Sequence, residues 1–202
     1  LGIVTNYPIQ DQKILKKSKV ELSSDLSKII NSAKPCLGFI GAGNYASRIL
    51  IPAFKNSDAE LITLVTSAGV SGVHHGIKND FAIASTNVSD ILTNERINTV
   101  CIVTRHDSHA QQVVEALNSG KNVFVEKPLA LTLDELEDIE KAYQNANKHN
   151  TVRLMVGFNR RFSPHIIKMK KLLGSHNSPK SIIMTVNAGY IPADHWVQDI
   201  SV

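Results

Sequence analysis

The sequence predicts an α/β fold built on a doubly wound parallel sheet, followed by the start of a second α/β domain. Short apolar, β-branched runs alternate with helical patterns, and these strand-like runs are almost continuously apolar. The first of them ends in a glycine-rich turn that opens a helix. Such alternation is typical of parallel sheets covered by helices on both faces, whose buried strands show little polar patterning.

Residues 1–34 are interpreted as a connector. They hold a short apolar run and then a polar, lysine-rich stretch, with one helix expected at about 22–32. The clear alternation starts only after Lys34-Pro35. We therefore expect the main domain to begin at residue 35.

Residues 35–158 carry the alternating pattern and are expected to form one domain. Its strands are expected at 36–41, 60–65, 81–85, 97–104, 121–127 and 151–158. Its helices are expected at 44–56, 88–94, 108–119 and 132–149. Helix-end signals support these limits, because Ser119-Gly120 can end one helix and Thr132 with Glu135 can form a capping box at the next.

The rhythm changes after residue 158. An arginine-rich turn precedes an expected helix at 163–173, an expected strand at 180–188 and an irregular tail. We interpret residues 159–202 as the incomplete start of a second domain.

The composition excludes several classes of partner. Apolar runs stay far below the roughly 18 residues of a membrane span, so no membrane partner is expected. The net charge is +4, but basic residues are scattered and aromatic residues make up only 5%, so no nucleic acid is expected either. Cys36 and Cys101 fall far apart in expected strands, which is typical of reduced core cysteines in a cytoplasmic protein.

The glycine-rich turn has the arrangement G-x-G-x-x-A over residues 41–46. Gly41 would permit the tight turn, Gly43 the approach of a pyrophosphate to the backbone, and the small Ala46 close helix-to-strand packing. Free amides and the helix dipole would favour the phosphates. The position of the turn predicts dinucleotide binding at Gly41, Gly43, Asn44 and Tyr45, and a merely structural turn is the alternative.

The second strand does not end in the acidic residue that often binds the adenosine ribose. The sequence from residue 64 reads LVTSAG, no acid follows until Asp80, and no arginine takes its place. The cofactor can therefore be NAD or NADP. Thr66 and Ser67 are the expected contacts to the ribose.

A Glu126-Lys127-Pro128 turn follows the fifth expected strand. The carboxyl edge of an open parallel sheet faces the ligand crevice, so Lys127 should project toward a bound nicotinamide. Pro128 stiffens the turn and restricts Lys127 to extended geometry. A lysine there can polarise a carbonyl or help take a proton from a substrate hydroxyl. From these residues alone, a surface lysine at a strand end is an open alternative.

Three segments, GFIGAGNYA, IVTRHDSHAQQVVEALNSGKNVFVEKPLAL and VGFNRRFSPH, resemble the family of glucose-fructose oxidoreductase, inositol dehydrogenase and rhizopine-catabolism proteins. The resemblance covers about residues 36–202. It implies a Rossmann domain followed by an α/β domain for substrate binding and oligomer contacts, so a homo-oligomer is expected. It also implies hydride transfer between NAD or NADP and a hydroxyl of a sugar, cyclitol or similar small molecule.

The resemblance assigns roles residue by residue. It makes Lys127 the catalytic lysine and places Glu126 beside the cofactor. The loop after the fourth strand is expected to contact the cofactor riboses, although many family members have proline and asparagine near Arg105 and His106. The expected loop contacts are Thr104, Arg105, His106 and His109. Asn159 and Arg160 are expected near the nicotinamide and Arg161 near the substrate, with a structural ion pair as the alternative for Arg161. His195 and Trp196 are expected near the substrate from their place in the tail, since the spacing of His195 does not match the family's second catalytic group.

The resemblance also implies a second catalytic group, a histidine preceded four residues earlier by an acid. The chain stops at Val202 before such a segment, so this group is expected outside it. At the amino end, LGIVTNYP at 1–8 resembles the final strand of zinc-type medium-chain alcohol dehydrogenases. We interpret the chain as a portion of a fusion with such a module.

Two alternatives complete the sequence-based picture. His106 and His109 have the spacing of a metal-binding pair, but further ligands are missing, so no metal is expected. His74 and His75 are expected to be exposed in a glycine-bounded segment. The alternative function is a non-catalytic dinucleotide-binding module that senses redox state or mediates assembly.

Overall fold

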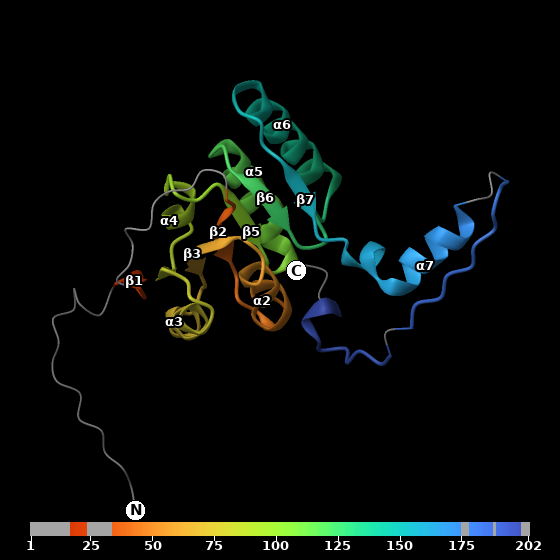
Figure 1. Ribbon diagram of the computed structural model, residues 1–202, viewed down its shortest axis with the longest axis horizontal. Coiled ribbons are helices and arrows are strands. Elements are labelled where there is room, and N and C mark those ends of the chain that lie inside the picture. Colours follow the sequence, from red (N-terminus) through yellow and green to blue (C-terminus); the bar gives the residue numbers. More distant parts are fainter. Residues whose placement is uncertain (1–16, 24–33, 175–177, 188, 199–202) are drawn as a thin grey trace, which may run out of the picture.

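The computed structural model describes residues 17–23, 34–174, 178–187 and 189–198, arranged around one twisted sheet (Figure 1). The seven strands lie in the order β1-β4-β3-β2-β5-β6-β7. They are β1 (Lys19–Glu21), β2 (Cys36–Ile40), β3 (Glu60–Val65), β4 (Ile83–Ser85), β5 (Thr99–Ile102), β6 (Asn122–Val125) and β7 (Leu154–Val156). The strands from β4 to β7 are parallel, and β1 pairs antiparallel with β4. This is the doubly wound arrangement that the sequence predicts.

Helices cover both faces of the sheet. They are η1 (Ala46–Leu50), α2 (Ile51–Lys55), α3 (Gly69–Lys78), α4 (Ser89–Leu92), α5 (His109–Asn118) and α6 (Leu133–His149). The helix α7 (Pro164–Leu173) follows β7 and lies apart from the sheet (Figure 1). Figure 1 shows α2 and α3 on one side of the sheet and α5 and α6 on the other. Each side has its own core: Phe39, Ile51 and Phe81 belong to one, and Val113 and Ile139 to the other.

The predicted strands and helix ends between residues 35 and 158 are largely confirmed. Each of the six expected strands is present, in most cases one to several residues shorter than expected. Thr132 caps α6 as expected, since its Oγ1 accepts from Glu135 N at 3.2 Å while Glu135 Oε2 accepts from Thr132 N at 3.2 Å. Gly120 follows α5 with a φ of +70°, a conformation that glycine adopts without steric cost.

The helix α3 was not predicted, because its glycines lower helix propensity and hide the periodicity. The structure shows why they are there. A Cβ on Gly72 would lie 2.6 Å from Thr66 Oγ1, and a Cβ on Gly76 would meet Leu22 Cδ1. Both histidines of the glycine-bounded segment lie on α3. The expected exposure is confirmed for His74 and was wrong for His75, which is partly buried.

The two flanking segments also differ from expectation. Residues 17–23 contribute β1, which lengthens the sheet at the β4 edge. The helix expected at about 22–32 falls mostly outside the described residues, as does the apolar run at 1–8. The helix expected at 163–173 is confirmed as α7. The strand expected at 180–188 is not formed by described residues 180–187, which are exposed and take part in no strand of the sheet.

Candidate functional site

The glycine-rich turn lies at the carboxyl end of the central strand β2. Gly41 has a φ of +102°, and a Cβ there would lie 2.6 Å from the carbonyl oxygen of Val103. A side chain on Gly43 would meet nothing within 4 Å, so this face of the turn is open. Ala46 is 2% exposed and packs into the core. The three small residues therefore fit their expected roles: Gly41 forms the tight turn, Gly43 leaves space beside the backbone, and Ala46 packs closely against the core.

Residues predicted to form the site converge because the strand order reverses between the parallel neighbours β2 and β5. From β2 the sheet continues through β3, whereas from β5 it continues through β6. Ligands of open α/β sheets bind in the crevice at such a switch point. Three hydrogen bonds align the strand ends at this edge: Gly41 N to Val65 O at 2.8 Å, Val103 N to Ile40 O at 2.9 Å and Glu126 N to Ile102 O at 2.9 Å.

The two residues expected at the adenosine ribose differ in access. Thr66 is 7% exposed, and its hydroxyl donates to the carbonyl oxygen of Ala68 at 2.8 Å. Ser67 is exposed at the same strand end, just before α3. Thr66 therefore shapes the turn, whereas Ser67 presents its side chain to the crevice edge.

The loop after β5 is ordered by its own polar side chains. Thr104 Oγ1 donates to Gln112 Oε1 at 3.0 Å and accepts from Ser108 Oγ at 2.7 Å. Arg105 is exposed and His106 partly buried in the short helix η2 (His106–Ser108). Burial lowers the pKa of His106, and the positive charge of Lys127 lowers it further. The ring of His106 therefore stays neutral more readily beside the lysine.

The Glu126-Lys127-Pro128 turn leaves the neighbouring strand β6 at the same edge. Lys127 is exposed, whereas Glu126 is partly buried. Burial raises the pKa of Glu126, and the hydrogen bond from the Lys127 backbone together with the charges of Lys127 and His109 opposes this rise. A Cβ on Gly157 would lie 2.7 Å from Glu126 Oε1, so the glycine after β7 leaves room for this carboxyl group.

His109 does not occupy the exposed position expected of a cofactor contact. It is 1% exposed, at the start of α5. Its Nδ1 lies 2.7 Å from the carbonyl oxygen of Pro128, and its Nε2 lies 3.2 Å from that of Thr104. The expectation of a direct ribose contact was wrong for this residue, because its ring lies behind the crevice and joins two loops. The spacing in the sequence could not reveal this burial.

No metal site is formed by the described part of the chain. The rings of His106 and His109 lie 5.8 Å apart, but no group of three or more histidine, cysteine or acidic side chains surrounds them. Both nitrogens of His109 face backbone oxygens. The spacing of the two histidines therefore reflects loop structure.

Residues after β7 return to the glycine-rich turn. Asn159, in the short helix η3 (Asn159–Phe162), donates from Nδ2 to the Tyr45 hydroxyl at 3.1 Å. Arg160 and Arg161 are exposed in the same helix, and the Arg161 guanidinium lies 4.7 Å from the centre of the Phe162 ring. Of the two expected nicotinamide contacts, Asn159 and Arg160, it is Asn159 that contacts the glycine-rich turn.

The tail holds the other expected substrate residues. His195 is exposed, and its Nδ1 accepts from Val197 N at 3.3 Å. Trp196 begins the short helix η4 (Trp196–Gln198). The His195 contact is a local cap of this turn, so the role proposed for the tail gains no geometric support from it.

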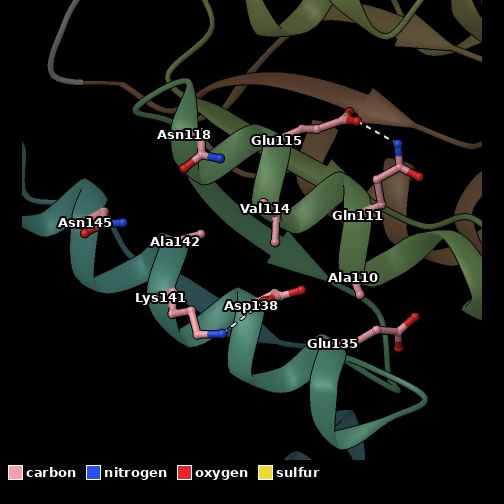
Figure 2. Close-up of a pocket in the computed structure, with 10 residues that line it drawn as sticks. All are labelled: Ala110, Gln111, Val114, Glu115, Asn118, Glu135, Asp138, Lys141, Ala142 and Asn145. Atoms are coloured by element: carbon pink, nitrogen blue, oxygen red, sulfur yellow. Dashed lines mark hydrogen bonds and ion pairs between the residues drawn. The ribbon is translucent and has the colours of Figure 1, made fainter.

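One hollow of the surface lies between α5 and α6, away from this edge. This hollow of about 600 Å³ separates the outer sides of α5 and α6, and Figure 2 shows its polar rim with Glu115, Asp138 and Lys141. In it, Gln111 Nε2 donates to Glu115 Oε1 at 2.9 Å and Lys141 pairs with Asp138 at 3.2 Å. This hollow is therefore distinct from the crevice. In the described residues, no helix is both long and apolar enough to cross a membrane.

Comparison with known proteins gives a consistent result. A model of an oxidoreductase family with an NAD-binding Rossmann fold matches residues 35–158. Oxidoreductase P35 of Formosa agariphila is 33% identical over 144 residues, which cover 69% of this chain and 42% of that protein. The scyllo-inositol 2-dehydrogenase (NAD(+)) of Bacillus subtilis is 34% identical over 108 residues, which cover 52% of this chain and 30% of that protein.

A solved structure shows the same fold. The 3-ketoreductase KijD10 from Actinomadura kijaniata, in complex with TDP-benzene and NADP, superposes with a TM-score of 0.63 at 19% identity. The superposition covers 70% of this chain and 44% of that one. The chain thus spans less than half the length of each of these three proteins.

Proposed function

The chain belongs to the oxidoreductase family of glucose-fructose oxidoreductase, inositol dehydrogenase and rhizopine-catabolism proteins, which has an NAD-binding Rossmann fold, and on this premise we propose its function. It is the cofactor-binding part of an enzyme that transfers hydride between NAD or NADP and a hydroxyl or carbonyl carbon of a sugar, cyclitol or similar small molecule. The observation that carries the proposal is the convergence of the open glycine turn and the Lys127 turn at one switch point.

The residues of the crevice fit a dinucleotide. The open face of Gly43 and the amides at the start of the following helix suit a pyrophosphate. Ser67 is placed for the adenosine ribose, and its edge carries neither an acid that would repel a 2′-phosphate nor an arginine that would bind one. We therefore propose that either NAD or NADP can be held, with Thr104, Arg105 and His106 along its ribose side.

Lys127 performs the proton chemistry in this proposal. When bound, the nicotinamide ring of the cofactor takes up or returns the hydride. The Lys127 amine binds the substrate oxygen and holds or moves its proton, which requires an exposed amine at the crevice edge. Glu126 lies next to it, and its raised pKa makes it less costly for this carboxyl group to hold a proton than for an exposed one.

The remaining parts of the proposal concern the whole protein. Residues 159–202 begin a substrate and oligomerisation domain, within which Arg161, His195 and Trp196 approach the substrate. Both cysteines of the described residues are unpaired and buried, which supports a reducing, cytoplasmic location. The expected fusion with a zinc-type module is proposed from the sequence alone, since residues 1–8 lie outside the described residues.

The cofactor part of the proposal can be tested with Gly43→Val. The Cβ of the added side chain lies more than 4 Å from the surrounding atoms, so the fold should be retained, but the side chain occupies the space proposed for the pyrophosphate. Titration calorimetry should show NADH and NADPH binding to the unchanged chain and at least about 100-fold weaker binding to the variant. Ala53→Val, on the exposed side of α2, is the control. Equal binding by Gly43→Val would place the cofactor elsewhere.

The enzymatic part needs the protein with its complete second domain. NAD and NADP reduction is followed with myo-inositol, scyllo-inositol and a panel of sugars. Turnover of at least one of them is expected. Cofactor binding without turnover on any of them would favour the non-catalytic binding module.

A further inference from the structure

We propose that His109 is a positioning residue. It fixes the Lys127-Pro128 turn relative to the Thr104 loop and thereby sets where the Lys127 amine stands in the crevice. The proposal rests on the proposed function, since it takes Lys127 as the group that acts on the substrate. It assigns His109 no contact with substrate or cofactor.

The two segments that His109 joins have just left neighbouring strands. β5 and β6 are paired in register up to Ile102 and Val125. The ladder continues to the hydrogen bond between Glu126 N and Ile102 O at 2.9 Å. Beyond this point, the link is the imidazole ring, with Pro128 O at 2.7 Å on one nitrogen and Thr104 O at 3.2 Å on the other.

The chemistry of the two partners explains why a histidine suits this place. Both are carbonyl oxygens, which can only accept hydrogen bonds. A neutral imidazole donates to one of them, in either tautomer, and an imidazolium donates to both. The charged and titratable groups around the ring are Glu126 and Lys127 after β6 and His106 on η2, whose ring lies 5.8 Å away.

Burial makes the link rigid. His109 is 1% exposed and belongs to the first turn of α5, so water cannot readily replace the ring. Removal of the ring would take away the hydrogen-bond donor between the two loops and would free the turn that carries Lys127. A misplacement of about 1 Å in a reacting group can cost about 100-fold in rate. We therefore expect His109 to matter for the rate step more than for cofactor affinity.

The test compares His109→Phe, which keeps a ring but has no donor, with His109→Gln, which keeps one donor. Val113→Ala is the matched control, because Val113 is fully buried one turn later on α5 and its apolar side chain donates no hydrogen bond to either loop. The control should lower the Tm to a similar extent. Amide hydrogen exchange of residues 104–108 and 126–130 should rise about tenfold or more in His109→Phe, less in His109→Gln, and not in Val113→Ala.

A second readout follows Lys127 without any substrate. After reductive ¹³C-methylation, the Lys127 signal is assigned by its loss in Lys127→Arg, and its chemical shift is measured in each variant. His109→Phe should change the chemical shift, and Val113→Ala should leave it unchanged. An unchanged chemical shift together with unchanged exchange in both loops would overturn the proposal. So would equal effects of Val113→Ala.

Kinetics then separate positioning from cofactor binding. With the complete protein, kcat should fall about tenfold or more in His109→Phe, while the Kd for NADH stays within about threefold. A loss of NADH affinity as large as the loss of kcat would make His109 part of the cofactor site and reject the positioning role. Failure of the complete protein to turn over any substrate would count against the proposed function, whereas the exchange and lysine readouts would still decide the role of His109.

Discussion

The side-chain amide of Asn159 donates a hydrogen bond to the hydroxyl of Tyr45 at 3.1 Å, although 114 residues separate them. Tyr45 is the second residue after Gly43 in the glycine-rich turn, and Asn159 is the first residue of η3 beyond β7. The bond therefore ties the segment that follows the Rossmann domain to the proposed phosphate-binding turn. It offers a direct route by which the segment after the domain can influence cofactor binding.

Tyr45→Phe should weaken cofactor binding modestly. The substitution keeps the ring and removes only the acceptor of Asn159, and such an exposed hydrogen bond contributes about 0.5–1 kcal/mol. Titration calorimetry should therefore show about two- to fivefold weaker binding of NADH. Tyr143→Phe, on α6, is the matched control. If both variants bind NADH like the unchanged chain, the bond plays no part in the cofactor site.

Lys127→Ala should remove catalysis and largely spare binding. General acid–base groups contribute about 100- to 10,000-fold to the rate, so kcat in the complete protein should fall by that range. The Kd for NADH should change by less than about threefold, because the amine is assigned to the substrate oxygen. Lys141→Ala changes an exposed lysine on α6 and serves as the control. Undiminished kcat in Lys127→Ala would refute the catalytic assignment.

Glu126→Gln should alter the pH dependence of stability. Burial raises the folded-state pKa of Glu126 above its unfolded value, so the stability that comes from burying the neutral group is present at low pH. It is lost as the pH rises through the folded pKa. The variant should therefore gain stability relative to the unchanged chain between about pH 4 and pH 7. Urea unfolding at both pH values measures the gain, and Glu137→Gln on the exposed side of α6 should show none.

Substitution by alanine should affect the stability of the fold differently at two glycines of α3. Gly72→Ala places a Cβ 2.6 Å from Thr66 Oγ1 and should destabilise the fold by about 1–3 kcal/mol. Gly69→Ala places its Cβ 3.5 Å from Thr86 Cγ2, an ordinary contact, and should change stability by less than about 1 kcal/mol. Urea unfolding of both variants compares them. A stabilising Gly72→Ala would show that close packing against Thr66 is not required.

Much of the site could be predicted because its parts are local patterns. The small residues between Gly41 and Ala46 predict the geometry of the turn, and the apolar composition of the strand segments predicts that they are buried. The position of Lys127 follows from one rule, since all parallel strands end at the same edge. The catalytic role of Lys127, in contrast, came from resemblance, and no local pattern distinguishes it from a surface lysine.

Other features depended on contacts that the sequence does not display. The helix α3 was missed because the low helix propensity of its glycines is visible in the local sequence, whereas the close packing that they allow against Thr66 and Leu22 is not. His109 was expected to contact the cofactor because the resemblance assigns that role to the loop after the fourth strand, and only the folded loops supply the two carbonyl oxygens that accompany its burial.

The sequence by itself determined the alternation of strands and helices, the open glycine turn and the edge at which Lys127 stands. Only the tertiary structure decided that β1 pairs with β4, that Gly72 and Gly76 allow close packing, and that His109 is buried behind the crevice. The physical reason is range. Periodicity, turn geometry and capping act within a few residues, whereas burial and hydrogen-bond partners are set by segments that meet only when the sheet has formed.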